Sequence, residues 1–244
     1  MVTWTTDDTF AIDDVEYVCR PINGRFPSTH DRFCLLKAPW QVEWYERLLH
    51  DLAPRTMIEV GMYDGASIAL CAQLVHPHTL IGIDNRDTRS AALDIFIADH
   101  RFHTSVRPHY GVDQADTARL DDILERDVTG PLDLVVDDAS HLYETTRTTF
   151  NYLYPRLRPG GCYVIEDWPM HRDPRIDIPL TLLVFQLLLA CAAAPRIVAD
   201  VTVNRNYAVI TRGEAELAPG PLDLACCYGP RAASLLDKID SASG

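Results

Sequence analysis

The sequence predicts an α/β fold, in the form of a Rossmann-like, doubly wound, mostly parallel seven-stranded sheet with an antiparallel last strand. Strand-like and helix-like segments alternate from residue 56 to residue 166, a pattern typical of parallel sheets covered on both faces. Two β-rich segments, at 196–203 and 207–211, then follow one another closely and predict a hairpin. This hairpin supplies the antiparallel strand.

The predicted elements follow from apolar periodicity and from proline and glycine breakers. Residues 1–36 are expected to be irregular, with Pro21, Gly24 and Pro27 as breakers, and an amphipathic helix is expected from Pro39 until just before Pro54. Strands are predicted at 56–60, 79–84, 106–110, 132–138 and around 163–167. Helices are predicted at 66–75, 89–100, 115–126, 178–194 and 231–239.

Three parts of the chain are expected. Residues 1–52 form an N-terminal segment and helix covering the active site, residues 53–213 form the catalytic core, and residues 214–244 form a tail with one helix. The apolar segment 178–194 is shorter than the roughly 20 residues of a membrane span, so it predicts a buried helix and no membrane insertion.

Composition narrows the class of protein. The formal net charge of -13 over 244 residues argues against nucleic acid or an anionic membrane as the main partner. Seven irregularly spaced cysteines do not resemble a disulfide framework, and the acidic N-terminus lacks a secretory signal pattern. We therefore expect reduced thiols and a cytoplasmic location.

The first strand-to-helix turn, after 56–60, has the features of a cofactor site. Gly61 and Gly65 permit a tight turn, but their GxxxG spacing differs from that of dinucleotide binders, and Glu59 would repel a pyrophosphate. Glu59 suits a cationic group, while Asp84, which ends the next strand, suits ribose hydroxyls. Together they favour S-adenosylmethionine. The alternative is ordinary turn glycines and a solvated strand end.

Two strand-like runs end in acid pairs, Asp137-Asp138 and Glu166-Asp167, and His141 follows the first pair. If the two runs are neighbouring parallel strands, these groups meet at one edge of the sheet, where they suit a hard divalent cation with a base beside it. The alternative is that the acids are unrelated strand ends and that His141 only supports the site. His171 is a further residue that could approach it.

With these motifs in place, the chain resembles class I S-adenosylmethionine-dependent methyltransferases of the macrocin and mycinamicin sugar O-methyltransferase type. The strings that carry the resemblance are IEVGMYDGAS at 58–67, IGIDNR at 81–86, GVDQAD at 111–116 and VVDDASH at 135–141, together with PGGCYVIEDW at 159–168. Related proteins include rhamnosyl O-methyltransferases and those called cephalosporin hydroxylases.

The resemblance implies a role for each site residue. It implies that S-adenosylmethionine is bound by Glu59, Gly61, Tyr63, Gly65, Ser67, Asp84, Asp113, Gln114 and Asp137. It implies that Mg²⁺ is held by Asp138, Glu166 and Asp167, and that His141 is the general base, with Asp138 as its catalytic neighbour.

The predicted function is Mg²⁺-dependent methyl transfer from S-adenosylmethionine to a hydroxyl of a sugar or glycoside. The expected acceptor is a small molecule or oligosaccharide with vicinal hydroxyls, and a homodimer is compatible with the resemblance. The alternatives are an O-methyltransferase for a catechol-like aromatic diol and a non-catalytic cofactor-binding accessory protein. The cluster has too few histidines for the usual iron centre of a hydroxylase.

Overall fold

The computed structural model describes residues 2–169, 179–218 and 220–228. It divides into two compact units, Met1–Asp113 and Gln114–Gly244. The predicted helix at 231–239 and His171 lie outside the described residues. The division falls within the predicted 53–213 core, and the three-part division proposed from the sequence stays a prediction.

The main sheet has seven strands in the order β10-β11-β9-β8-β5-β6-β7. The first unit contributes three strands that pair in parallel: β5 (Thr56–Val60), β6 (Thr79–Asp84) and β7 (Val106–Tyr110). Those of the second are β8 (Leu132–Asp137), β9 (Leu157–Glu166), β10 (Val198–Val203) and β11 (Tyr207–Arg212). Because β8 and β9 are parallel while β11 is antiparallel to β9 and to β10, the predicted fold class is confirmed.

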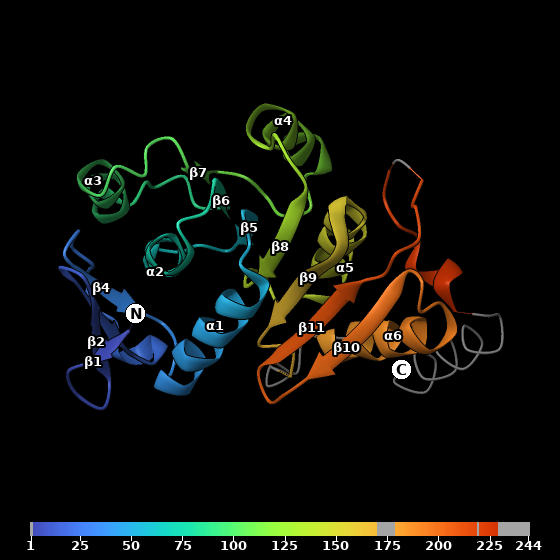
Figure 1. The fold of residues 1–244 in the computed structure, drawn as a ribbon, viewed down its shortest axis with the longest axis horizontal. Helices are drawn as coiled ribbons and strands as arrows, with labels where there is room; N and C mark the ends of the chain where they lie inside the picture. Colours follow the sequence, from blue (N-terminus) through green and yellow to red (C-terminus); the bar gives the residue numbers. More distant parts are fainter. Residues whose placement is uncertain (1, 170–178, 219, 229–244) are drawn as a thin grey trace. The chain divides into compact units, whose positions relative to one another are not determined.

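In the first unit the helices are α1 (Pro39–Leu52), α2 (Ala66–Val75) and α3 (Ala91–Asp99). Helix α1 begins at a proline, which suits the first helical position, and the side chain of Gln41 accepts a hydrogen bond from the backbone of Ala38 at 2.7 Å. Its end at Ala53, which has a φ of 43°, comes just before Pro54, as predicted. Helix α2 contacts α1, α3 and β4 (Figure 1).

The prediction that residues 1–36 are irregular is wrong. They form a second sheet of four short strands, β1 (Thr3–Trp4), β2 (Thr9–Ile12), β3 (Val15–Cys19) and β4 (Arg32–Leu35), and a 3-10 turn at Ile22–Gly24. Aromatic rings hold this sheet within the first unit: Phe10 stacks on Tyr17, Tyr17 on Phe33, and Phe33 meets Phe96 of α3 edge-on. The breakers Pro21, Gly24 and Pro27 all lie between β3 and β4, so they interrupt none of the four strands.

The second unit contains α4 (Thr117–Asp127), α5 (Tyr143–Leu153) and α6 (Leu180–Ala193), with 3-10 turns at Tyr154–Arg156 and Leu224–Cys227. Helix α6 lies against α5 and β10 (Figure 1). The prediction of a buried helix here holds for one face, which includes Leu183 and Leu187, whereas Phe185 is 60% exposed. None of the described helices qualifies as a membrane span.

All seven cysteines fall within the described residues, and none forms a disulfide. The expectation of reduced thiols stays a prediction. Burial raises the pKa of the Cys19 thiol to about 12, so this thiol is protonated at neutral pH.

Candidate functional site: a glycine turn and an acid-histidine cluster

The glycine turn of the first unit connects β5 to α2. Its backbone is left-handed at Gly61, Tyr63 and Gly65, with φ values of 95°, 46° and 84°. A Cβ added to Gly65 would lie 2.6 Å from Cδ2 of Leu93, so this position has no room for a side chain. The turn is therefore closed by packing against α3 as well as by its backbone conformation.

Glu59 is buried at the end of β5, and its Oε1 accepts a hydrogen bond from the Ser67 hydroxyl at 2.5 Å. Ser67 lies in the first turn of α2, so this contact ties the predicted cofactor acid to the helix that follows the turn. A buried carboxylate at this place favours a cation over an anion, as the sequence led us to expect.

Asp84 ends β6 and is also buried. Its Oδ2 accepts the backbone N–H of Tyr63 at 2.8 Å, and its Oδ1 accepts the backbone N–H and the Nε–H of Arg86, each at 2.9 Å. The guanidinium of Arg86 lies 4.3 Å from the centre of the Tyr63 ring. The two predicted cofactor residues Tyr63 and Asp84 are thus brought into direct contact, with Arg86 as a partner that the sequence did not suggest.

Asp113 is exposed and is the last residue of the first unit, while Gln114 is buried and is the first residue of the second. The amide nitrogen of Gln114 donates to Thr149 at 3.1 Å and to Oδ1 of Asp137 at 3.4 Å, and its oxygen accepts the backbone N–H of Ser140 at 3.0 Å. Gln114 therefore anchors the loop that follows β8. Its predicted role at the cofactor, like that of Asp113, stays a prediction.

Asp137, the last residue of β8, is buried, and its Oδ2 accepts a hydrogen bond from the Tyr163 hydroxyl at 2.8 Å. Burial raises the pKa of Asp137 to about 6, although the hydrogen bond from Tyr163 lowers it. The side chain thus supports the loop from inside the protein. Cofactor binding by Asp137 stays a prediction.

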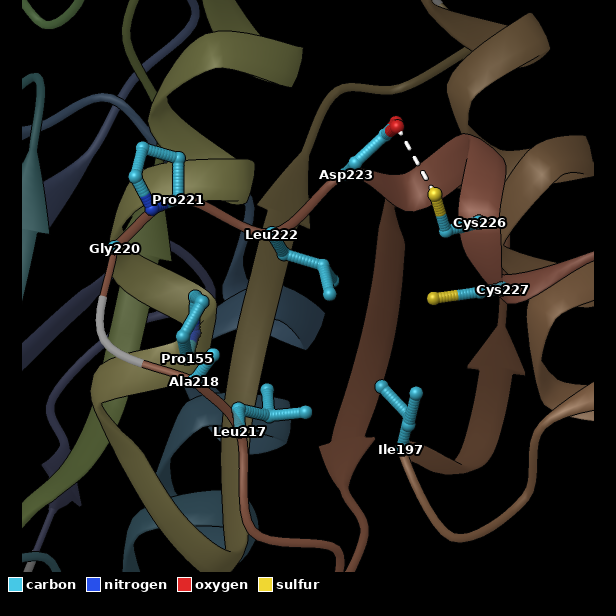
Figure 2. Close-up of a pocket in the computed structure, with 10 residues that line it drawn as sticks. All are labelled: Pro155, Ile197, Leu217, Ala218, Gly220, Pro221, Leu222, Asp223, Cys226 and Cys227. Atoms are coloured by element: carbon cyan, nitrogen blue, oxygen red, sulfur yellow. Dashed lines mark hydrogen bonds between the residues drawn. The ribbon is translucent and has the colours of Figure 1, made fainter.

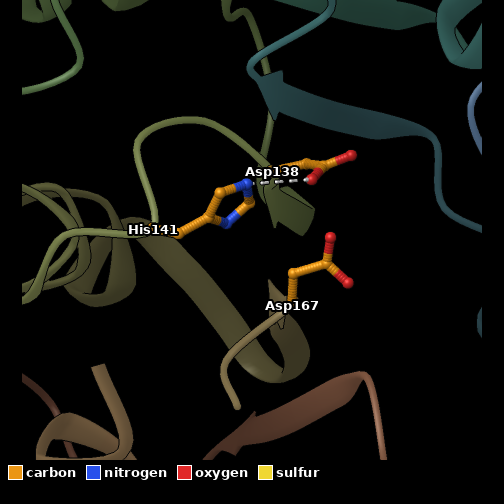
Figure 3. A group of neighbouring side chains, drawn as sticks. All are labelled: Asp138, His141 and Asp167. Atoms are coloured by element: carbon orange, nitrogen blue, oxygen red, sulfur yellow. Dashed lines mark ion pairs between the residues drawn. The ribbon is translucent and has the colours of Figure 1, made fainter. Parts of the chain in front are cut away.

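The acid-histidine cluster consists of Asp138, His141 and Asp167, and Figure 3 shows the three side chains converging. One ligand atom from each lies within 4.8 Å of the other two, and Nε2 of His141 is 3.8 Å from Oδ1 of Asp138. Asp138 directly follows β8, and Asp167 directly follows β9. Since β8 and β9 are parallel neighbours, the expectation that the two acid pairs share one edge of the sheet is confirmed.

Two members of the cluster have strained backbones. The φ values are 54° at His141 and 50° at Asp167, a left-handed conformation that costs a non-glycine residue about 1–2 kcal/mol. Such strain persists where the surrounding structure imposes it, and it gathers at functional sites.

Glu166 is not among the three residues of this cluster. It is the last residue of β9, pairs across the sheet with Tyr207 and is 2% exposed. The cluster instead includes His141, which the resemblance makes the base and not a ligand. The assignment of Glu166 as a metal ligand stays a prediction.

The turn between β10 and β11 also reaches the cluster, which the sequence analysis missed. Nδ2 of Asn206 donates to Oδ1 of Asp167 at 2.6 Å, and Nε1 of Trp168 donates to the carbonyl oxygen of Asn204 at 2.9 Å. The predicted antiparallel strand could have revealed this contact. An antiparallel strand starts beside the end of its neighbour, so the residues just before β11 lie beside those just after β9.

The cluster has the chemistry of a divalent cation site. Two carboxylates provide the hard oxygen ligands that Mg²⁺ prefers, and an imidazole lies beside them. All three side chains are partly exposed, so an ion and an acceptor molecule have access to them. The donor set thus fits the predicted metal.

A separate cavity of about 210 Å³ lies in the second unit, beside the 3-10 turn at Leu224–Cys227 (Figure 2). Its lining is mostly apolar, with Leu217 and Leu222 on one side and Cys227 on the other. The thiol of Cys226 donates to Oδ2 of Asp223 at 3.1 Å, and this hydrogen bond raises the pKa of the thiol. The cavity contains none of the predicted site residues.

The chain resembles proteins of known class over its central part. Residues 58–168 match the family model described as "Methyltransferase domain". The 8-demethyl-8-alpha-L-rhamnosyl tetracenomycin-C 2'-O-methyltransferase of Streptomyces olivaceus is 36% identical over 127 residues, which cover 47% of this chain and 30% of that protein. The demethylmacrocin O-methyltransferase of Streptomyces fradiae is 36% identical over 144 residues, covering 53% and 33%. The match thus spans about a third of these relatives.

Among solved structures, the MycE methyltransferase from the mycinamycin biosynthetic pathway, in complex with Mg, S-adenosylhomocysteine and mycinamycin VI, is similar with a TM-score of 0.58. It is 27% identical, and the match covers 78% of this chain and 53% of that one. The matched family segment 58–168 includes the glycine turn, Asp84 and all three residues of the acid-histidine cluster.

Proposed function

We propose that this chain, whose residues 58–168 match a methyltransferase-domain model and resemble O-methyltransferases of antibiotic sugars, transfers a methyl group from S-adenosylmethionine to a hydroxyl of a sugar or glycoside in a Mg²⁺-dependent reaction. The observation that carries the proposal is the convergence of Asp138, His141 and Asp167 after two parallel strands. This arrangement places an imidazole base beside oxygen ligands for a metal. An alcohol acceptor needs such a base to take its proton.

The glycine turn and the acids at the ends of β5 and β6, Glu59 and Asp84, are proposed to bind the cofactor. Glu59 suits the cationic amino-acid end, and Asp84 suits the ribose hydroxyls. Gly61 and Gly65 let the backbone approach the ligand closely. Asp84 is oriented by the backbone of Tyr63, so its carboxylate is preorganised before a cofactor arrives.

The acids at the ends of β8 and β9 are proposed to hold the metal, with Asp138, Glu166 and Asp167 as ligands. A Mg²⁺ ion held by these residues would supply positive charge that lowers the pKa of an acceptor hydroxyl. Vicinal hydroxyls of a sugar would suit this geometry. Asp137 and Gln114 support this site indirectly, because they fix the loop that carries Asp138 and His141.

His141 is proposed to take the proton from the acceptor hydroxyl. The oxygen forms a bond to the methyl carbon, the bond from sulfur to that carbon breaks, and S-adenosylhomocysteine leaves. Nε2 of His141 lies 3.8 Å from Oδ1 of Asp138, close enough for the carboxylate to stabilise the imidazolium that results. General base catalysis of this kind contributes typically 10²–10⁴-fold in rate.

The same residues would serve a catechol-like aromatic diol, and the observation that favours a sugar is the class of the relatives. The test incubates the purified chain with S-adenosylmethionine and a panel of rhamnosides, other glycosides and catechols, and detects methyl ethers by mass spectrometry. We expect methylated glycosides, loss of the product in excess EDTA, and recovery with Mg²⁺.

Each other result would change the proposal. Full activity in excess EDTA would remove the metal role, and methylation of catechols alone would move the acceptor to aromatic diols. Cofactor binding by calorimetry without transfer to any acceptor would favour a non-catalytic accessory protein.

A further inference from the structure

We infer that Asn206 is a positioning residue, which orients the carboxylate of Asp167 toward the metal. This inference rests on the metal-dependent function proposed above. It assigns a role to a residue 39 positions beyond Asp167 in the chain, outside the matched segment 58–168.

The hydrogen bond between Asn206 and Asp167 is short, and only one assignment of donor and acceptor is possible. Nδ2 of Asn206 lies 2.6 Å from Oδ1 of Asp167, and the ionised carboxylate can only accept hydrogen bonds, so the amide must present its nitrogen. Hydrogen bonds to an ionised acceptor are about twice as strong as neutral ones. One hydrogen bond leaves the other lone-pair sites of the carboxylate available to a cation while it fixes the orientation of the group.

The strand register explains how the contact arises. Strand β11 runs antiparallel to β9, and the pairing ends with Tyr207 opposite Glu166. Residue Asn206, just before β11, therefore lies beside Asp167, just after β9. The first residues of an antiparallel strand lie at the edge where the parallel strands end, and the amide of Asn206 is therefore at this edge.

The turn that carries Asn206 is itself fixed. Oδ1 of Asn204 accepts the backbone N–H groups of Asn206 and Tyr207, each at 2.9 Å, and the carbonyl oxygen of Asn204 accepts Nε1 of Trp168. The residues on both sides of the Asn206–Asp167 contact are thus held by other hydrogen bonds. This matters because Asp167 has a left-handed backbone and would otherwise relax.

Residues that hydrogen-bond to a ligand, without touching the metal, typically change metal affinity 10–100-fold when replaced. We therefore expect Asn206→Leu, which keeps the branch at Cγ and the number of side-chain heavy atoms but has no donor, to weaken Mn²⁺ binding by 10–100-fold. Asn206→Gln keeps the donor on a longer arm and should remain closer to wild type. Thr202→Val is the matched control, because Thr202 lies on the same hairpin and its hydroxyl bonds only to exposed Asp200 among the described contacts.

The experiment measures free Mn²⁺ by electron paramagnetic resonance during titration of the whole chain, and melting temperatures in EDTA. The expected result is a weaker Mn²⁺ affinity in Asn206→Leu, with a wild-type affinity in Thr202→Val. If Asn206→Leu does not fold, Asn206→Ser, whose hydroxyl is too short to reach Asp167, makes the same comparison and should show the same loss.

The outcomes separate this inference from the proposed function. Wild-type Mn²⁺ affinity in Asn206→Leu overturns the role of Asn206 alone. Equal losses in the Leu and Gln variants overturn it too, because they would attribute the effect to the shape of the turn. A wild-type chain that binds no Mn²⁺ overturns the metal-dependent function together with the inference.

Discussion

The hydroxyl of Tyr163 donates a hydrogen bond to Oδ2 of Asp137 at 2.8 Å, joining β9 to the end of β8 inside the second unit. The carboxyl group is completely buried, and burial raises its pKa to about 6. This buried acid therefore takes up its proton at a higher pH than an exposed aspartate.

This pKa predicts how stability depends on pH. The unfolded chain loses the proton near pH 3.8, whereas the folded chain keeps it to about pH 6, so the folded chain binds more protons between these values. The contribution of Asp137 to the free energy of unfolding should thus fall by roughly 3 kcal/mol as pH rises through this window, then stay level. Asp137→Asn should lack this fall. Urea denaturation in EDTA at several pH values would test it, and parallel curves for both proteins would contradict it.

Replacing the proposed base separates chemistry from cofactor binding. His141→Gln should lower kcat by 10²–10⁴-fold, because no other group takes the proton, while the affinity for S-adenosylhomocysteine stays unchanged. The matched control is His103→Gln, at an exposed position of the first unit. Kinetics and calorimetry are the measurements, and wild-type turnover in His141→Gln would remove His141 as the base.

Glu166 and His141 are rival candidates for the third ligand of the metal. Because Mg²⁺ prefers oxygen, we expect Glu166→Gln to weaken Mn²⁺ binding at least about tenfold and His141→Gln to change it less than about threefold. Titration of both variants with Mn²⁺ distinguishes the two. The reverse order of losses would make the cluster of Asp138, His141 and Asp167 the true ligand set.

Asp84 is predicted to hold the ribose of the cofactor. Hydrogen bonds to charged groups contribute about 1.5–3 kcal/mol, so Asp84→Asn should weaken S-adenosylhomocysteine binding by about 10–100-fold. Binding of Mn²⁺ should not change. Asp87→Asn, an exposed acid three residues further on, is the control. Calorimetry measures both affinities, and an unchanged value in Asp84→Asn would end this assignment.

The core of the fold could be predicted because its strands are strongly apolar. The apolar segments 56–60 and 79–84 form their predicted strands with the predicted bounds, and the segment 66–75 forms its predicted helix. The N-terminal sheet escaped prediction because its strands have two to five residues, too few for a clear periodicity. Its stability comes from stacking between rings far apart in sequence, such as Tyr17 and Phe33.

The candidate site was predictable wherever a residue directly follows a strand. Asp138 and Asp167 meet as expected, since parallel neighbours end at one edge. The partners of these residues were not predictable in the same way. Arg86 and Asn206 act through side-chain contacts whose geometry depends on turns, and no sequence period marks them.

The left-handed backbone at His141 and Asp167 has a different consequence at each position. Glycine adopts this conformation at no steric cost, so His141→Gly should melt close to the wild-type temperature in EDTA, although it removes the proposed base. Asp167→Gly should melt at a lower temperature, because it also removes the hydrogen bond from Asn206. The side chain at position 167 thus contributes to the fold as well as to the proposed site, whereas the one at position 141 would be kept for the proposed chemistry.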